Sequence, residues 1–234
     1  MKIFPPPSAS SAAKPAEKAA RAPGARSPAL PKGKPHAKLP GEIRIVGGQY
    51  KRTKIPVPNR EGLRPTPDRV RETLFNWLGQ DLNGWRCADV FAGTGALGFE
   101  AASRGAADVL LCEQDAALMA PLQALKTRLK ADMVRIERGD GLSALRRLSA
   151  GSMHLVLLDP PFESSVFEPA LKAAAEALAP AGLVYLEAPR AWANDELLPL
   201  GLQVYRSGKA GAVHFHLLVK AEAAAPAADN APAA

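Results

Sequence analysis

The chain has 234 residues, of which 47% are hydrophobic, so it is long enough for about one ordinary domain with a sizeable core. Its formal net charge is +7, and it has no run of the roughly 18 apolar residues that a membrane span needs. Two cysteines, Cys87 and Cys112, are too few for a disulfide scaffold. We therefore expect reduced core cysteines in a cytoplasmic protein that has no membrane partner.

The positive charge is concentrated at the front of the chain. Residues 1–40 carry eight Lys or Arg and one Glu, and residues 41–76 carry eight basic and four acidic side chains. Residues 77–234 hold fourteen basic and eighteen acidic side chains. A cationic front is typical of proteins that bind a polyanion, although a tail that only aids solubility would have the same composition.

Both ends of the chain have a low-complexity composition. Residues 1–40 are mainly Pro, Ala, Lys and Ser, and residues 221–234 are mostly Ala and Pro. Such segments bury too little apolar surface to offset the entropy of ordering them, so we expect both to be disordered. Between them we predict a hairpin and helix at 41–80 and an α/β domain at 81–220.

The segment 41–80 has the pattern of a small hairpin followed by a helix. IRIVGG (43–48) and KIPVP (54–58) are short apolar runs joined by a polar, basic turn. Thr66-Pro67-Asp68 then predicts a helix start with Thr66 as the N-cap. The apolar stripe of this helix consists of Val70, Leu74, Trp77 and Leu78.

From residue 86 onward, strand-like apolar runs alternate with helix-like segments. The strand candidates are CADVF, DVLLCE, MVRIE, HLVLLD, LVYLE, LQVYR and VHFHLLV, and helices are expected at 96–104, 115–130 and 165–178. Pro121 and Pro169 fall inside two of these helices, where each marks either a later helix start or a kink. We predict a doubly wound α/β fold with a mostly parallel seven-stranded sheet. Because no helix separates the last two strands, we expect them to form an antiparallel pair at one edge.

A glycine-rich loop follows the first strand of this sheet. FAGTGALG (91–98) places Gly93, Gly95 and Gly98 in the pattern G-x-G-x-x-G, and Glu113 ends the next strand. Glycines let the backbone turn tightly and approach a ligand, and the acid can bind ribose hydroxyls. The order of strand, loop, helix and acid indicates a nucleoside cofactor.

Four acidic side chains separate two classes of nucleoside cofactor. Asp89, Glu113, Asp140 and Asp159 lie at or near the carboxyl ends of successive strands, where such sheets bind ligands. Carboxylates repel the pyrophosphate of a dinucleotide, but they suit the sulfonium, amino group and ribose hydroxyls of S-adenosylmethionine. The acids therefore favour S-adenosylmethionine, although any one of them could instead be a helix cap or a solvated loop residue.

The strand HLVLLD ends in the tetrapeptide Asp159-Pro160-Pro161-Phe162. The amino group of a nucleobase is a poor nucleophile, because its lone pair is delocalised into the ring. The Asp159 carboxylate and the Pro160 carbonyl could accept hydrogen bonds from both of its N–H groups, and the prolines would fix these acceptors in place. Phe162 offers a face on which the base can stack. The tetrapeptide thus predicts methylation of an amino group without a metal.

These motifs resemble those of class I S-adenosylmethionine-dependent methyltransferases that act on amino groups. More narrowly, IRIVGGQYKR, LRPTPDRVRETLFNWL, DVFAGTGALGFEA and LLDPPF resemble the bacterial 16S ribosomal RNA guanine-N2 methyltransferase family across residues 42–220. The resemblance implies a Rossmann-like catalytic domain at 81–220, with 41–80 contacting RNA and covering the cofactor. It also implies N2 methylation of guanine 966 in the small ribosomal subunit or an assembly intermediate, and we expect a monomer.

The same resemblance assigns roles to individual residues. It implies a cofactor site made of Asp89, Phe91, Gly93, Gly95, Glu113, Gln114, Asp140 and Leu142. Within that site Glu113 would hold the ribose hydroxyls, whereas Gln114, Asp140 and Leu142 would contact the adenine. The tetrapeptide Asp159-Pro160-Pro161-Phe162 would hold the target guanine.

Basic side chains before the sheet are candidates for RNA phosphate contacts. They are Arg44, Lys51, Arg52, Lys54 and Arg64. The alternative is a solvated charged face, with Arg69 and Arg71 paired to helix acids.

Three other functions remain open. A DNA adenine-N6 or cytosine-N4 methyltransferase can carry DPPF, but it often has a separate recognition domain. A nicotinamide-dependent oxidoreductase fits the glycine pattern, but not the acidic crevice. A non-catalytic ribosome-assembly factor on the same fold would not need an intact tetrapeptide.

Overall fold

The computed structural model describes residues 41–60, 63–162 and 165–221. The leader predicted at 1–40 and nearly all of the tail predicted at 221–234 lie outside the described residues, so their predicted disorder stays a prediction. Among the described residues, no helix is both long and apolar enough to cross a membrane. Cys87 and Cys112 are free and buried, as expected for core residues.

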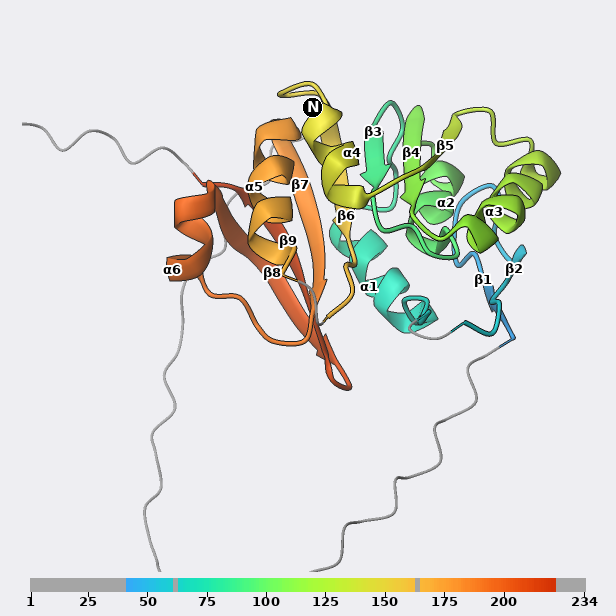
Figure 1. Cartoon of the computed structure of the whole chain (residues 1–234), viewed down its shortest axis with the longest axis horizontal. Helices are drawn as coiled ribbons and strands as arrows, with labels where there is room; N and C mark the ends of the chain where they lie inside the picture. The colour runs from blue at the N-terminus through green and yellow to red at the C-terminus, as the bar shows by residue number, and fades with distance from the viewer. Residues whose placement is uncertain (1–40, 61–62, 163–164, 222–234) are drawn as a thin grey trace, which may run out of the picture. The chain divides into compact units, whose positions relative to one another are not determined.

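A seven-stranded sheet forms the centre of the fold, in the order β5-β4-β3-β6-β7-β9-β8 (Figure 1). Its strands are β3 (Arg86–Asp89), β4 (Asp108–Glu113), β5 (Val134–Arg138), β6 (Met153–Leu158), β7 (Leu178–Ala188), β8 (Leu202–Ala210) and β9 (Val213–Lys220). The first five strands in this order are parallel, and β9 runs antiparallel to both β7 and β8. The doubly wound fold and its antiparallel edge pair are therefore confirmed.

Helices cover both faces of the sheet (Figure 1). One face packs against α1 (Asp68–Trp77), α2 (Ala96–Ser103) and α3 (Ala116–Leu129). The other face packs against α4 (Gly141–Arg147), α5 (Phe167–Ala177) and α6 (Asn194–Leu197). Helix α6 continues into the short 3-10 helix η1 (Leu198–Leu200). Each layer buries its own apolar cluster, because alternate strand residues point to opposite faces. The chain leaves β3 toward β4 and β5 and later returns to β6 on the other side of β3. The strand order thus reverses between β3 and β6, which is where such sheets bind ligands.

The two prolines inside predicted helices have different outcomes. Helix α3 begins at Ala116, with the Asp115 carboxylate accepting the Ala117 N–H at 2.9 Å, and it continues through Pro121. Helix α5 begins at Phe167, two residues later than predicted, so Pro169 falls in its first turn. A first-turn N–H needs no partner within the helix, so proline is tolerated there.

A two-stranded antiparallel hairpin, β1 (Glu42–Arg44) and β2 (Lys54–Pro56), precedes the sheet, as predicted. It is joined to the domain through Glu100 of α2, whose buried carboxylate accepts the N–H groups of Val46 and Gly47 at 2.8 Å. The same carboxylate pairs with Arg71 of α1 at 3.3 Å and with Arg104 at 2.9 Å. Arg71 is fully buried and also pairs with Asp68, so it connects hairpin, α1 and α2 and presents no charge to RNA.

Candidate active site

Four acidic side chains gather at the carboxyl edge of the sheet. They are Asp89 at the end of β3, Glu113 at the end of β4, Asp159 directly after β6 and Glu187 near the end of β7. The side chains two residues earlier on these strands all belong to one buried cluster, on the face covered by α1, α2 and α3. Because side chains alternate along a strand, the four carboxylates point toward that same face. The structure thus brings together three of the predicted acids and adds Glu187.

The glycine loop connects β3 to α2 in the way that the sequence predicts. Gly93 and Gly95 have φ values of +53° and +77°, which side-chain-bearing residues rarely adopt. At Gly95 a Cβ atom would also lie 2.7 Å from the Phe99 ring and 2.8 Å from Leu122. The Asp89 carboxylate accepts the Gly98 N–H at 2.9 Å and so joins the end of β3 to the start of α2. The positive φ values, the close contacts at Gly95 and this hydrogen bond together restrain the conformation of the loop.

Glu113 positions the same loop from the neighbouring strand. Its Oε2 accepts the Gly93 N–H at 2.8 Å, and its Oε1 accepts the Asp115 N–H at 2.7 Å. Each carboxylate oxygen has a second lone-pair direction, so hydroxyl donors can still bind. Gln114 is exposed beside it, within reach of solvent or a ligand.

Asp140 lies after β5, where it caps α4. Its Oδ2 accepts the Ser143 N–H at 2.8 Å, and hydrogen bonds from Ser143 hold the pKa of this exposed carboxyl below its ordinary value. Leu142 and Phe91 are half-buried and pack against the cluster under α4 and α5. The predicted cofactor residues therefore line one stretch of the edge, from β3 to β5.

The tetrapeptide follows β6 on the other side of β3. Pro160 is buried, whereas Pro161 is exposed and the Phe162 ring is 38% exposed, one of the two large apolar side chains that are exposed in the described part of the chain. Asp159 lies between them and the strand end. Burial, together with the nearby carboxylates of Glu187 and Asp89, raises the pKa of Asp159 well above its ordinary value. In such surroundings the ionised form of a carboxylate is stabilised by any N–H donor or cation that reaches it.

Glu187 is a site residue that the sequence analysis did not assign. It is 4% exposed, and its Oε1 accepts hydrogen bonds from the Thr66 hydroxyl at 2.6 Å and the Tyr185 hydroxyl at 3.0 Å. Burial raises the pKa of Glu187, and the two hydroxyl donors partly oppose that rise. The signal for it was an acid at the end of the strand LVYLE, in the same position as Asp159 at the end of β6.

Thr66 corrects the predicted start of α1. The helix begins at Asp68, and Pro67 occupies the N-cap position without a side-chain cap. The prediction of Thr66 as N-cap was wrong because its hydroxyl is committed to Glu187, 121 residues away. Farther back in the same segment, Arg60 pairs with Asp115 at 3.0 Å and 2.5 Å. This segment therefore contacts residues at both ends of the acidic edge.

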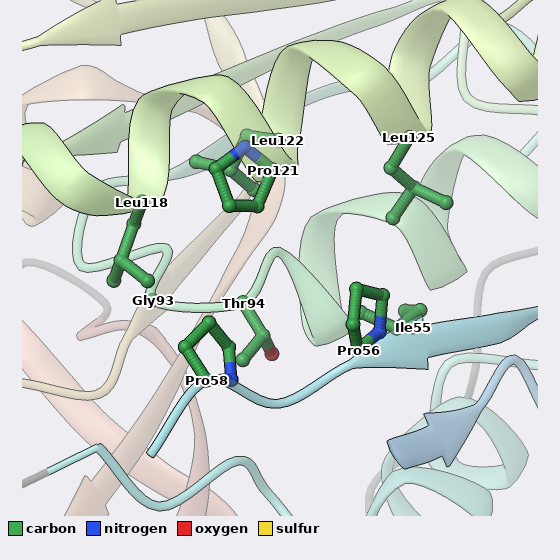
Figure 2. Close-up of a pocket in the computed structure, with 9 residues that line it drawn as sticks. All are labelled: Ile55, Pro56, Pro58, Gly93, Thr94, Leu118, Pro121, Leu122 and Leu125. Atoms are coloured by element: carbon green, nitrogen blue, oxygen red, sulfur yellow. The ribbon is translucent and has the colours of Figure 1, made fainter. Parts of the chain in front are cut away.

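Pro56, which ends β2, and Pro58, which follows it, lie against the glycine loop and α3 (Figure 2). Together they enclose an apolar pocket of about 10 Å³, lined by Ile55, Pro56, Pro58, Gly93, Thr94, Leu118, Pro121, Leu122 and Leu125. That volume holds about one water molecule, so the pocket is packing between elements and not a nucleoside site. The Thr94 hydroxyl is buried without a hydrogen-bond partner among the described residues, so the loop retains a polar group that a ligand could satisfy.

The candidate RNA-contacting side chains are all exposed. Arg44, Lys51, Arg52 and Arg64 form no ion pair with the described residues, and Lys54 pairs with Glu42 at 2.8 Å. An exposed ion pair of this kind is worth little, so Lys54 can exchange it for a phosphate.

The chemistry of the acidic edge selects among nucleoside ligands. Asp89 and Glu187 are buried and Asp159 is half-buried beside them, and burial raises the pKa of Asp89 to about 7. Such a group resists a pyrophosphate but favours ammonium or sulfonium charge and N–H or O–H donors. The unpartnered Thr94 hydroxyl and the carboxylate acceptors of Glu113 and Asp140 complete a set of hydrogen-bonding groups that fits S-adenosylmethionine.

Comparisons with known proteins agree with this geometry. A family model described as "Conserved hypothetical protein 95" matches residues 43–219. The ribosomal RNA small subunit methyltransferase D of Escherichia coli strain K12 is 40% identical over 187 residues, which cover 79% of this chain and 93% of that protein. The protein of the same name from Haemophilus influenzae is 40% identical over 158 residues, covering 65% of this chain and 81% of that protein.

Solved structures give the same result. A putative methyltransferase from Escherichia coli matches with a TM-score of 0.65 and 36% identity, covering 77% of this chain and 98% of its own. A putative methylase from Haemophilus influenzae matches with a TM-score of 0.64 and 30% identity, covering 78% of this chain and 100% of its own. Both alignments span nearly all of the solved chain and more than three quarters of this one.

Proposed function

Since this chain belongs to the conserved hypothetical protein 95 family, which includes the ribosomal RNA small subunit methyltransferases D, we propose that it methylates ribosomal RNA with S-adenosylmethionine. The finer proposal is transfer to N2 of a guanine in 16S RNA, by family likeness guanine 966. The substrate would be the small subunit or one of its assembly intermediates, met in the cytoplasm by a monomeric enzyme.

The cofactor half of the proposal rests on the edge from β3 to β5. When bound, S-adenosylmethionine supplies a methyl group on a positively charged sulfur. The glycine loop would lie beneath its methionyl part, and Glu113 would accept from the ribose hydroxyls through the lone pairs that Gly93 and Asp115 leave available. Gln114, Asp140 and Leu142 would contact the adenine.

The target half rests on the tetrapeptide. The Asp159 carboxylate and the Pro160 carbonyl would accept the two N–H groups of the guanine amine, which draws electron density onto that nitrogen. As the nitrogen gains a methyl group it must lose one proton, and the Asp159 carboxylate is the proposed acceptor because its pKa is raised. Phe162 would stack on the base after it has left its helix or loop.

One observation carries the proposal: the half-buried carboxylate of Asp159 and the exposed ring of Phe162 stand three positions apart at a rigid strand end, beside a glycine loop. An oxidoreductase has no use for this arrangement. The proposed RNA contacts of the segment 41–80 rest on Arg44, Lys51, Arg52, Lys54 and Arg64, which are exposed.

The test uses S-adenosylmethionine carrying a tritiated methyl group. The purified chain is incubated with small subunits from cells that lack this methylation, and in parallel with naked 16S RNA and with DNA. We expect label as N2-methylguanine in the subunit. Label in DNA would instead indicate a DNA amino methyltransferase, and cofactor binding without transfer would indicate a non-catalytic assembly factor.

A further inference from the structure

The carboxylate of Glu187 is held by two hydroxyl groups on a single oxygen. Thr66 donates to Oε1 at 2.6 Å and Tyr185 donates to the same atom at 3.0 Å. Both donors are buried, at 3% and 0% exposure, so their positions are fixed by packing. Within the described part of the chain Oε2 accepts no hydrogen bond. One oxygen is therefore anchored, and the other is available to a ligand.

Strand pairing places Glu187 next to the tetrapeptide Asp159-Pro160-Pro161-Phe162. Leu157 pairs with Tyr185 and Leu158 with Leu186 in the parallel register of β6 and β7. The next step along both strands brings Asp159 level with Glu187, at the usual spacing of about 4.8 Å between neighbouring strands. The raised pKa of Asp159 agrees with this placement, since burial is its main cause and the charge of Glu187 is the next.

The position of Glu187 along the sheet assigns it to the substrate side. The order β4-β3-β6-β7 puts the glycine loop on one side of Asp159 and Glu187 on the other. A methyl donor above β3 and β4 leaves the space above β6 and β7 for the base. An acceptor at the end of β7 therefore meets the base and not the cofactor.

Guanine presents a matching donor. Its ring N1–H lies directly beside the 2-amino group, whereas adenine has an acceptor at N1 and no amino group at C2. We propose that Glu187 is a specificity-determining residue whose Oε2 accepts the N1–H of the target guanine while Asp159 and Pro160 hold the amino group. This assignment rests on the proposed function. Because Glu187 is buried, a base that leaves it unpaired is penalised, and that penalty gives discrimination.

The experiment compares two bases at the methylated position. Small subunits are reconstituted with 16S RNA that carries either guanine or 2-aminopurine at the nucleotide labelled by the wild-type enzyme. 2-Aminopurine keeps the amino group and lacks the N1–H. The readout is the ratio of kcat/KM for guanine to that for 2-aminopurine, measured for the wild type and for Glu187→Gln. Loss of folded protein lowers both rate constants equally and leaves this ratio unchanged.

We expect the ratio to fall by about 10- to 100-fold in Glu187→Gln. The glutamine oxygen is a weaker acceptor for N1–H, and the glutamine amide can donate to the bare N1 of 2-aminopurine. Glu176→Gln is the matched control, since Glu176 is exposed on α5 on the opposite face of the sheet. It should keep the wild-type ratio.

Two results would overturn the assignment, and they can be told apart. If Glu187→Gln still selects guanine as strongly as the wild type, Glu187 does not read N1–H, and the proposed function stands. If the wild type transfers no methyl group to the guanine 2-amino nitrogen, the proposed function fails, and the assignment fails with it.

Discussion

The acidic edge has two halves that hold their carboxylates differently. On the side of β3, β4 and β5, each carboxylate accepts backbone N–H groups from residues close in the chain. Asp89 accepts from Gly98, Glu113 from Gly93 and Asp115, and Asp140 from Ser143. On the side of β6 and β7, Glu187 accepts from two side-chain hydroxyls, one of them 121 residues away.

The difference indicates how the two halves divide the work. Backbone amides keep the position of a carboxylate the same throughout a reaction. Such fixed acceptors suit a cofactor that always binds in the same orientation. Burial raises the pKa values of Asp159 and Glu187, and the β6–β7 half keeps acceptor capacity that a donor on a ligand can use. Asp89 is intermediate, because burial outweighs its one amide bond and raises its pKa to about 7.

Asp159→Ala should produce the largest effect and separate the halves most clearly. Removing the proposed acceptor for the amine and its proton should lower the rate of methyl transfer by about 10³-fold. Binding of S-adenosylhomocysteine, followed by calorimetry, should stay close to that of the wild type, because the β3–β5 half is untouched. The control is Asp132→Ala, an exposed acid before β5. Wild-type turnover in Asp159→Ala would contradict its role.

Asp89→Asn should remove a pH dependence of stability. The pKa of Asp89 is about 7 in the folded protein against an ordinary value of 3.8, so the unfolded chain releases this proton first as the pH rises. The contribution of Asp89 is therefore complete below about pH 4 and is lost as the pH rises to 7. The free energy of unfolding should fall by about 2–4 kcal/mol less in Asp89→Asn than in the wild type over that range.

Urea unfolding from pH 4 to pH 8 measures this difference, with Asp132→Asn as the exposed control. Asparagine can still accept the Gly98 N–H, so the loop contact is kept. Parallel curves for Asp89→Asn and the wild type would mean that Asp89 is ionised without cost. In that case Asp89 would behave like Glu113 and Asp140, as a carboxylate held by backbone amides.

The difference between the β3–β5 half and the β6–β7 half also explains which parts of the site could be predicted from the sequence. The glycine loop and its acids follow from local patterns, because the donors to Glu113 and Asp140 are two to twenty residues away. Glu187 and Thr66 could not be paired from sequence, since only tertiary packing brings them together. The buried ion pair between Arg71 and Glu100 could not be predicted from sequence either, because closely spaced arginines are typical of a charged surface.

Charge reversal on the hairpin should have the smallest effect and should act on the substrate half only. Lys51→Glu with Arg52→Glu should weaken subunit binding about 5- to 20-fold at low salt and reduce its salt slope by about 1.5 to 2, because two phosphate contacts are lost. S-Adenosylhomocysteine binding should not change. Lys172→Glu with Lys220→Glu gives the same net charge at exposed sites away from the hairpin. Equal salt slopes for both double variants would mean that overall charge, and not the hairpin, attracts the RNA.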